Sequence, residues 1–207
     1  MSFFEPPPAP PAPQRPRPLP WIGPPDNVLG AVVPLNVLLA RTDDVAITVA
    51  GGFAYPTGVE LTVSARSRRA EHDWMDSFQP RFARRKPGLP PELLRFGIEF
   101  ADGRRATNLG WPWSGRPDDE PERPVLAQHG GGGSGRHFRQ EFWLWPLPPP
   151  GPLAFVCEWP AYGIPETRRE IEASVILDTA AQAEMLWPDE PGGDDYGFSE
   201  TTLVGTD

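Results

Sequence analysis

Short segments of alternating apolar and polar residues, separated by breaks rich in proline and glycine, are the feature that most constrains this chain's fold. These segments recur from residue 28 to residue 175. Side chains of a β-strand point alternately to its two faces, so the pattern gives each strand one apolar face. Short strands that follow one another without repeated helices predict packed antiparallel sheets.

The predicted strand at residues 59–66 shows the clearest alternation. Val59, Leu61 and Val63 fall on one face, and polar side chains fall on the other. Similar patterns predict further strands, at residues 27–42, 45–55, 93–100 and 104–109. Asp102-Gly103 separates the last two of these segments and favours a hairpin there, because both residues suit a tight turn between strands.

The stretch from residue 136 to residue 164 is the densest hydrophobic signal in the chain. It predicts two strands, at residues 138–145 and 153–159. The prolines between them exclude a helix, since each lacks an N–H and restricts the residue before it. We expect the two strands to pair with each other in antiparallel fashion; a crossing between two sheets is the alternative.

A glycine run at residues 130–135 resembles a phosphate-binding loop only in composition. It lacks the Gly-Lys-Ser/Thr ending that such a loop requires, so a flexible linker is the better interpretation. Further along, the pattern predicts a last strand at residues 167–174. A short helix at residues 180–187 follows, with Asp178 and Thr179 as candidate N-caps. A single helix over residues 166–187 is the alternative.

Together these elements predict an all-β fold, an antiparallel β-sandwich of the immunoglobulin-like kind with seven or eight strands and a short C-terminal helix. A partly closed β-barrel is the alternative. The domain is expected to span residues 26–187, between a disordered proline-rich arm at residues 1–25 and a disordered acidic tail at residues 188–207.

Charge and composition differ sharply between these regions. Eleven of the thirty prolines lie in the first 25 residues, and the tail carries six of the nine net negative charges. The remainder is close to neutral, so nothing recommends nucleic acid as a partner. Eighteen arginines against one lysine, with abundant alanine, glycine and proline, suggest a GC-rich bacterial origin.

Cysteine usage and hydropathy indicate a cytoplasmic protein. Cys157 is the sole cysteine and falls on an apolar strand face, which predicts a buried, unreactive thiol and no disulfide. The N-terminus lacks the basic start and apolar run of a secretory signal. No segment approaches the ~18 apolar residues of a membrane helix. No membrane association and no cofactor are expected.

Candidate binding residues are few. Trp111 and Trp113 in an irregular loop, with Arg136 and His137 nearby, would suit a flat ligand such as a carbohydrate. His129 and His137 do not show zinc-ligand spacing, and there is no Gly-x-Ser-x-Gly elbow. We therefore expect a non-enzymatic protein-interaction or structural module. A ligand-binding sandwich that uses the loop tryptophans is the alternative, and a hydrolase is a third hypothesis.

Overall fold

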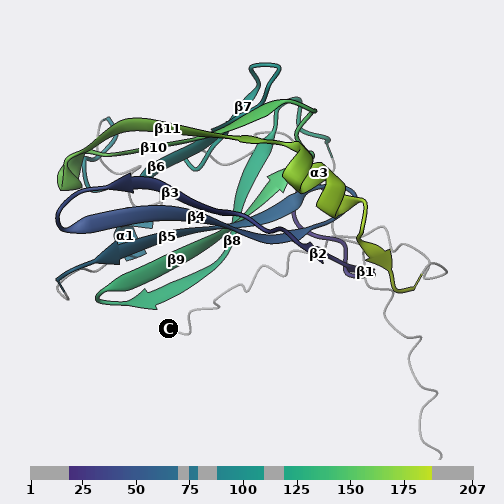
Figure 1. The fold of residues 1–207 in the computed structure, drawn as a ribbon, viewed down its shortest axis with the longest axis horizontal. Coiled ribbons are helices and arrows are strands. Elements are labelled where there is room, and N and C mark those ends of the chain that lie inside the picture. The colour runs from purple at the N-terminus through teal and green to yellow at the C-terminus, as the bar shows by residue number, and fades with distance from the viewer. Residues whose placement is uncertain (1–18, 70–74, 79–87, 110–118, 188–207) are drawn as a thin grey trace, which may run out of the picture.

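Two antiparallel sheets pack face to face in this protein (Figure 1). The computed structural model describes residues 19–69, 75–78, 88–109 and 119–187. Within them the chain is mostly strand, and the sheets do not close into a barrel. The predicted all-β sandwich is therefore confirmed, and the barrel alternative is not the one adopted.

The larger sheet has six strands and the smaller has four. The larger comprises β2 (Ala31–Val32), β3 (Asn36–Arg41), β4 (Val45–Ala54), β5 (Val59–Ser67), β9 (His137–Trp145) and β8 (Val125–Ser134). The smaller comprises β11 (Ile164–Glu172), β10 (Pro152–Trp159), β6 (Arg95–Glu99) and β7 (Arg105–Thr107). β3 pairs with β4 at one edge and lies against β11 of the smaller sheet.

The strand order is that of immunoglobulin-type sandwiches. One sheet contains the order β4-β5-β9-β8 and the other β7-β6-β10-β11. β5 is followed by β6 across the sandwich, and β9 by β10. The two crossings lie side by side, because β5 is hydrogen-bonded to β9 in the larger sheet and β6 to β10 in the smaller. This places the strands as in the seven-strand immunoglobulin arrangement, with β7 as the additional strand of the smaller sheet.

The expected hairpin between residues 138–145 and 153–159 is wrong. β9 pairs with β5 and β8, whereas β10 pairs with β6 and β11. The proline-rich connection instead carries the chain from one sheet to the other. A stiff, extended loop suits such a crossing, because prolines resist the tight reversal that a hairpin needs.

A single hydrophobic core fills the space between the sheets. Leu61, Phe142 and Phe155 come from three strands and are all buried within it. Burying each such side chain contributes about 1.5–3 kcal/mol. Cys157 is also buried there as a free thiol, and this burial raises its pKa to about 12. The prediction of a buried cysteine is confirmed.

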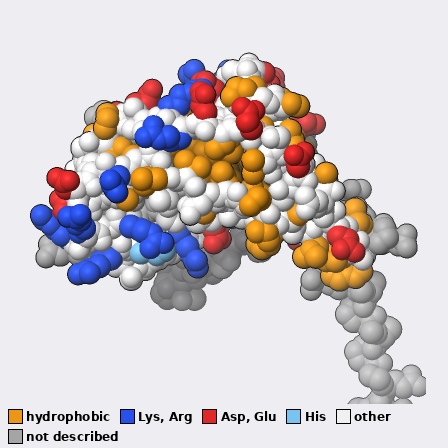
Figure 2. Space-filling model, viewed as in Figure 1, with side chains coloured by type: hydrophobic (Ala, Val, Ile, Leu, Met, Phe, Trp, Pro, Cys, Tyr) orange, Lys and Arg blue, Asp and Glu red, His pale blue; other side chains and the backbone are white. Residues whose placement is uncertain are grey.

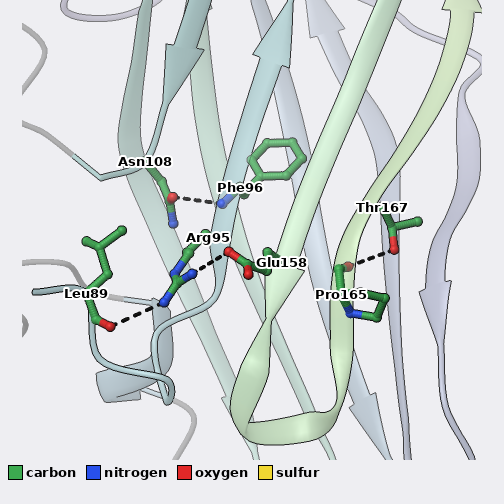
Figure 3. Close-up of polar contacts among 7 residues, drawn as sticks. All are labelled: Leu89, Arg95, Phe96, Asn108, Glu158, Pro165 and Thr167. Atoms are coloured by element: carbon green, nitrogen blue, oxygen red, sulfur yellow. Dashed lines mark hydrogen bonds and ion pairs between the residues drawn. The ribbon is translucent and has the colours of Figure 1, made fainter.

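The ends of the core are closed by local structures. The single-turn helix α1 (Met75–Phe78) inserts Phe78 against Phe138 and Trp159, with ring centroids 4.7 and 6.1 Å away. Beside it, the buried Asn108 side chain accepts from Phe96 N at 2.8 Å and donates to Leu94 O at 2.9 Å (Figure 3). Asn108 thus replaces backbone partners where β7 has ended.

The glycine run is a strand, not the flexible linker that its composition predicts. β8 includes residues 130–133 and is paired along β9, with a register shift between Gln128 and Gly131. At Gly133 glycine is needed because the backbones approach closely, whereas Gly132 has open space around it. A Cβ at Gly133 would lie 2.0 Å from His137 O.

The C-terminal helix lies earlier than predicted. Helix α3 (Ser174–Ala180) begins directly after β11, so Asp178 and Thr179 lie in its body and are not N-caps. Thr179 Oγ1 instead donates to Val175 O, one turn back. After α3 the chain pairs β12 (Glu184–Met185) with β1 (Val28–Leu29). A short 3-10 turn, η1 (Pro160–Tyr162), joins β10 to β11.

None of the helices in the described part of the chain is both long and apolar enough to cross a membrane.

Candidate functional site

The outer face of the smaller sheet is covered by ion pairs. Glu99 pairs with Arg105 and, at 2.8 Å, with Arg168, which also contacts Glu170 at 2.9 Å. Arg95 pairs with Glu158 and donates to Leu89 O at 3.2 Å (Figure 3). These side chains satisfy one another across neighbouring strands, so this face offers little unpaired charge to a ligand.

The outer face of the larger sheet carries an aromatic surface, defined here as Tyr55, His129, Trp143 and Trp145. Alternation along β9 turns Trp143 and Trp145 away from the core, yet Trp143 has no exposed surface. Residues 19–25, here called the N-terminal strap, contact Trp143, as do Tyr55 and Gly58, and together these residues bury it. Trp21 of the strap is itself only 7% exposed.

Three directed contacts fix the strap on the aromatic surface. Trp143 Nε1 donates to Pro20 O at 2.9 Å. His129 Nε2 lies 2.8 Å from Ile22 O, to which it donates when that nitrogen carries the proton. The rings of Trp21 and Trp145 meet edge to face, with centroids 5.8 Å apart and planes at 66°.

Glycines leave room for these contacts. A Cβ at Gly58 would lie 2.5 Å from Trp143 Cζ2, and one at Gly23 would lie 2.8 Å from His129 Cε1. Both distances are below any normal Cβ contact, so a side chain at either position would displace a ring. Glycine at position 23 therefore allows the strap to approach His129 this closely, and glycine at position 58 makes room for the Trp143 ring within the sheet.

The floor of the aromatic surface is partly removed from water. Tyr55 meets Trp143 edge to face at 5.7 Å, and its hydroxyl donates to Glu60 Oε2 at 3.4 Å. Burial, followed by the charge of Glu60, raises the pKa of Tyr55 to about 12. Burial also raises the pKa of Glu60 above its usual value. Both shifts mark a low-dielectric environment beneath the strap.

A cavity of about 400 Å³ opens beside Trp145. Trp145 and Pro146 line it on the side of the aromatic surface, and charged residues at 104, 120, 122 and 123 line the rest. On the other side, Gly30 lies next to Tyr55, and the exposed pair Val32 and Phe53 extends the apolar surface toward the sheet edge.

Two of the four predicted site residues lie within the described part of the chain. Arg136 and His137 lie at the turn between β8 and β9, at the opposite end of β9 from the aromatic surface. Trp111 and Trp113 lie outside the described residues, so the proposed grouping of all four is untested. No group of three potential metal-ligating side chains occurs within the described ranges.

His137 lies in a positively charged environment. It faces Arg66 across the strand pair, two positions from Arg139. Burial, and then the charges of Arg66 and Arg139, lower its pKa. Its Nε2 atom is buried and has no hydrogen-bond partner among the residues that the structure describes. The two arginines were not predicted as neighbours of His137, because only the register of β5 against β9 brings Arg66 there.

The aromatic surface was not among the predicted sites. The outward direction of Trp143 and Trp145 follows from alternation along residues 138–145, but their partner segment lies more than a hundred residues earlier. The available signal was Trp21, an aromatic residue between prolines next to the predicted domain boundary. Comparisons with protein-family models, curated proteins and solved structures found no match to this chain.

Proposed function

We propose that this protein is a non-enzymatic protein-binding module whose aromatic surface recognises proline-rich segments. The proposal rests on one observation: Trp143 donates its indole N–H to Pro20 O of the chain's own strap, against which the aromatic surface packs. The strap sequence from residue 19, LPWIGPP, is itself proline-rich. The domain therefore already holds a segment of the ligand class that we assign to it.

Physical chemistry favours this ligand class. Proline has no N–H, so a proline-rich segment has fewer internal donors than acceptors and leaves carbonyls free to accept. In the strap, Ile22 N donates to Leu19 O at 2.8 Å, whereas Pro20 O accepts from Trp143. The stiffness of such a segment lowers the entropy lost on binding, and aromatic rings supply a broad apolar contact. The indole N–H of a buried Trp requires an acceptor, which Pro20 O provides.

The strap is an imperfect occupant. Trp21 Nε1 is buried and has no hydrogen-bond partner among the described residues. An unpaired buried donor costs about 1–3 kcal/mol. Attachment to the domain compensates, because a short linker gives the strap an effective concentration in the millimolar range. An external segment that pairs this donor, or that reaches the cavity beside Trp145, can compete with the strap.

Weakening the strap should make the aromatic surface available. We expect the full-length Trp21→Ala variant to bind a synthetic peptide of residues 1–25 at least tenfold more tightly than the wild type does, by isothermal titration calorimetry. The exposed Trp187 offers a matched control, because Trp187→Ala removes a tryptophan without touching the strap. The same peptide with alanine in place of every proline should not bind.

The proposal would be wrong if Trp21→Ala, with an unchanged circular dichroism spectrum, bound neither peptide. Equal binding of both peptides would also contradict it, because proline would then play no part. We further propose a cytoplasmic location, which is supported by a single buried cysteine that needs no oxidising compartment.

A further inference from the structure

One end of the sandwich is strongly basic. Figure 2 shows Lys and Arg side chains gathered at the end of the β3–β4 turn, away from α3 and β12. We call this surface the arginine end. Its members are exposed, and they are Arg41, Arg66, Arg68, Arg69, Arg136 and Arg139. The aromatic surface lies at the other end of β9, so the two surfaces are separate.

The backbone brings these arginines together from β3, β5 and β9, from the residues that follow β5, and from the β8–β9 turn. Ser67 N donates to Arg136 O at 2.9 Å, which ties the end of β5 to the β8–β9 turn. Arg68 N donates to Asp44 O at 3.0 Å, which ties the same strand to the β3–β4 turn. A cavity of about 400 Å³ is lined by Arg41, Arg66 and Arg68, and also by Asp43 and Asp44 of the β3–β4 turn.

The six arginines of this end outnumber the two nearby carboxylates, Asp43 and Asp44. Arg69 lies 3.6 Å from Asp44, and both side chains are more than half exposed. The other five arginines have no carboxylate within 4.0 Å in the described part of the chain, in contrast to the paired arginines of the smaller sheet. The lowered pKa of His137, caused first by burial and then by Arg66 and Arg139, reports the same positive field.

The chain also carries the complementary charge. Residues 188–207 hold six acidic side chains and no basic one. This segment begins directly after Trp187, toward the α3 end of the molecule (Figure 1). The ten residues of β4 cover about 33 Å along the sandwich, at ~3.3 Å per residue. Twenty extended residues reach at most about 66–72 Å, which is ample to return to the arginine end.

We propose that the acidic segment 188–207 binds the arginine end of its own domain. A tethered segment has an effective concentration near millimolar, which suffices for a contact made of several weak ion pairs. Exposed pairs of this kind are screened by salt, so the contact should be strong at low ionic strength and absent at high. The segment then acts as an intramolecular competitor for any other acidic ligand of this surface.

The test places a nitroxide on the acidic segment of the full-length chain through Ser199→Cys, because native Cys157 is buried and its thiol is unreactive. We expect the amide NMR signals of Ser67, Arg68 and His137 to broaden at about 10 mM NaCl, where the Debye length is ~30 Å. The signals should recover at about 1 M NaCl, where it is ~3 Å. The double variant Arg66→Gln/Arg139→Gln should lose most of the broadening.

A matched control removes two exposed arginines elsewhere. Arg104→Gln/Arg123→Gln changes the net charge equally and should leave the broadening intact. Absence of broadening at low salt, or equal loss in both double variants, would overturn the proposal. So would broadening seen only when spin-labelled chains are mixed with isotope-labelled ones, which would assign the acidic segment to a second copy.

A short DNA duplex provides a further discrimination. If it shifts the arginine-end signals only after salt or substitution has released the acidic segment, the two compete and the proposal stands. If it binds with the same affinity whether or not the acidic segment is neutralised, the surface belongs to nucleic acid and the proposal fails.

Discussion

At the scale of single residues, Trp143 shows how burial can arise on the outer face of a sheet. Its side chain points away from the core, but the strap helps to remove it from water and accepts its indole hydrogen bond through Pro20 O. Its ring also packs against Tyr55 and is admitted by Gly58. A substitution at Trp143 therefore affects both the hydrogen bond to the strap and the apolar packing of the ring.

Two substitutions separate these contributions. Trp143→Phe removes the N–H donor and should cost about 1 kcal/mol in the free energy of unfolding. Trp143→Ala also removes the ring and should cost about 3–5 kcal/mol. Urea denaturation followed by circular dichroism measures both. Equal losses for the two variants would show that ring packing contributes nothing beyond the hydrogen bond.

His137 should make stability depend on pH. Its pKa is lower in the folded state, so the unfolded chain binds more protons as pH falls through the usual histidine value of about 6.5. Stability contributed by the neutral side chain is thus fully present above this value and declines below it. We expect His137→Gln to lose less stability than the wild type between pH 7 and pH 5, in thermal melts at each pH. Parallel curves would contradict this expectation.

At the scale of elements, β5 was predicted from its local sequence pattern and the glycine half of β8 was not, and the difference shows what such a pattern can specify. β5 alternates strictly, and its three leading apolar side chains are buried as predicted. β8 has no alternation in its glycine half, because glycine has no side chain, and at Gly133 the β9 backbone comes too close to admit one. Composition therefore predicted a linker there, although the strand is stabilised by its partner and not by its own side chains.

The glycine half of β8 offers a matched pair of substitutions. A Cβ at Gly133 would meet the His137 backbone, whereas one at Gly132 would meet nothing within 4 Å. Gly133→Ala should therefore lower the free energy of unfolding by about 1–3 kcal/mol. Gly132→Ala should be close to neutral. Thermal unfolding of the two variants compares them directly, and similar melting temperatures would show that β9 can shift to admit a methyl group.

At the scale of the whole molecule, the sandwich was predictable because apolar faces repeat, but strand partners were not. Alternation along residues 138–145 and 153–159 is the same whether these strands pair with each other or cross between sheets. The same limit applies to the candidate sites. Arg136 and His137 could be proposed together because they are adjacent in sequence, whereas Arg66 and the strap reach their positions only through long-range contacts.

The crossed arrangement of β5–β6 and β9–β10 has a consequence for synthesis of the chain. β9 pairs with β5 and β10 with β6, β11 then pairs with β10, and α3 adds core residues up to Ala180, so the interior cannot be closed until residue 180 has left the ribosome. Until β9 and β10 have emerged, β5 and β6 have edges without hydrogen-bond partners, and their apolar faces are exposed to the surroundings. Folding of this domain should accordingly be slow and late, with its second half supplying the closure.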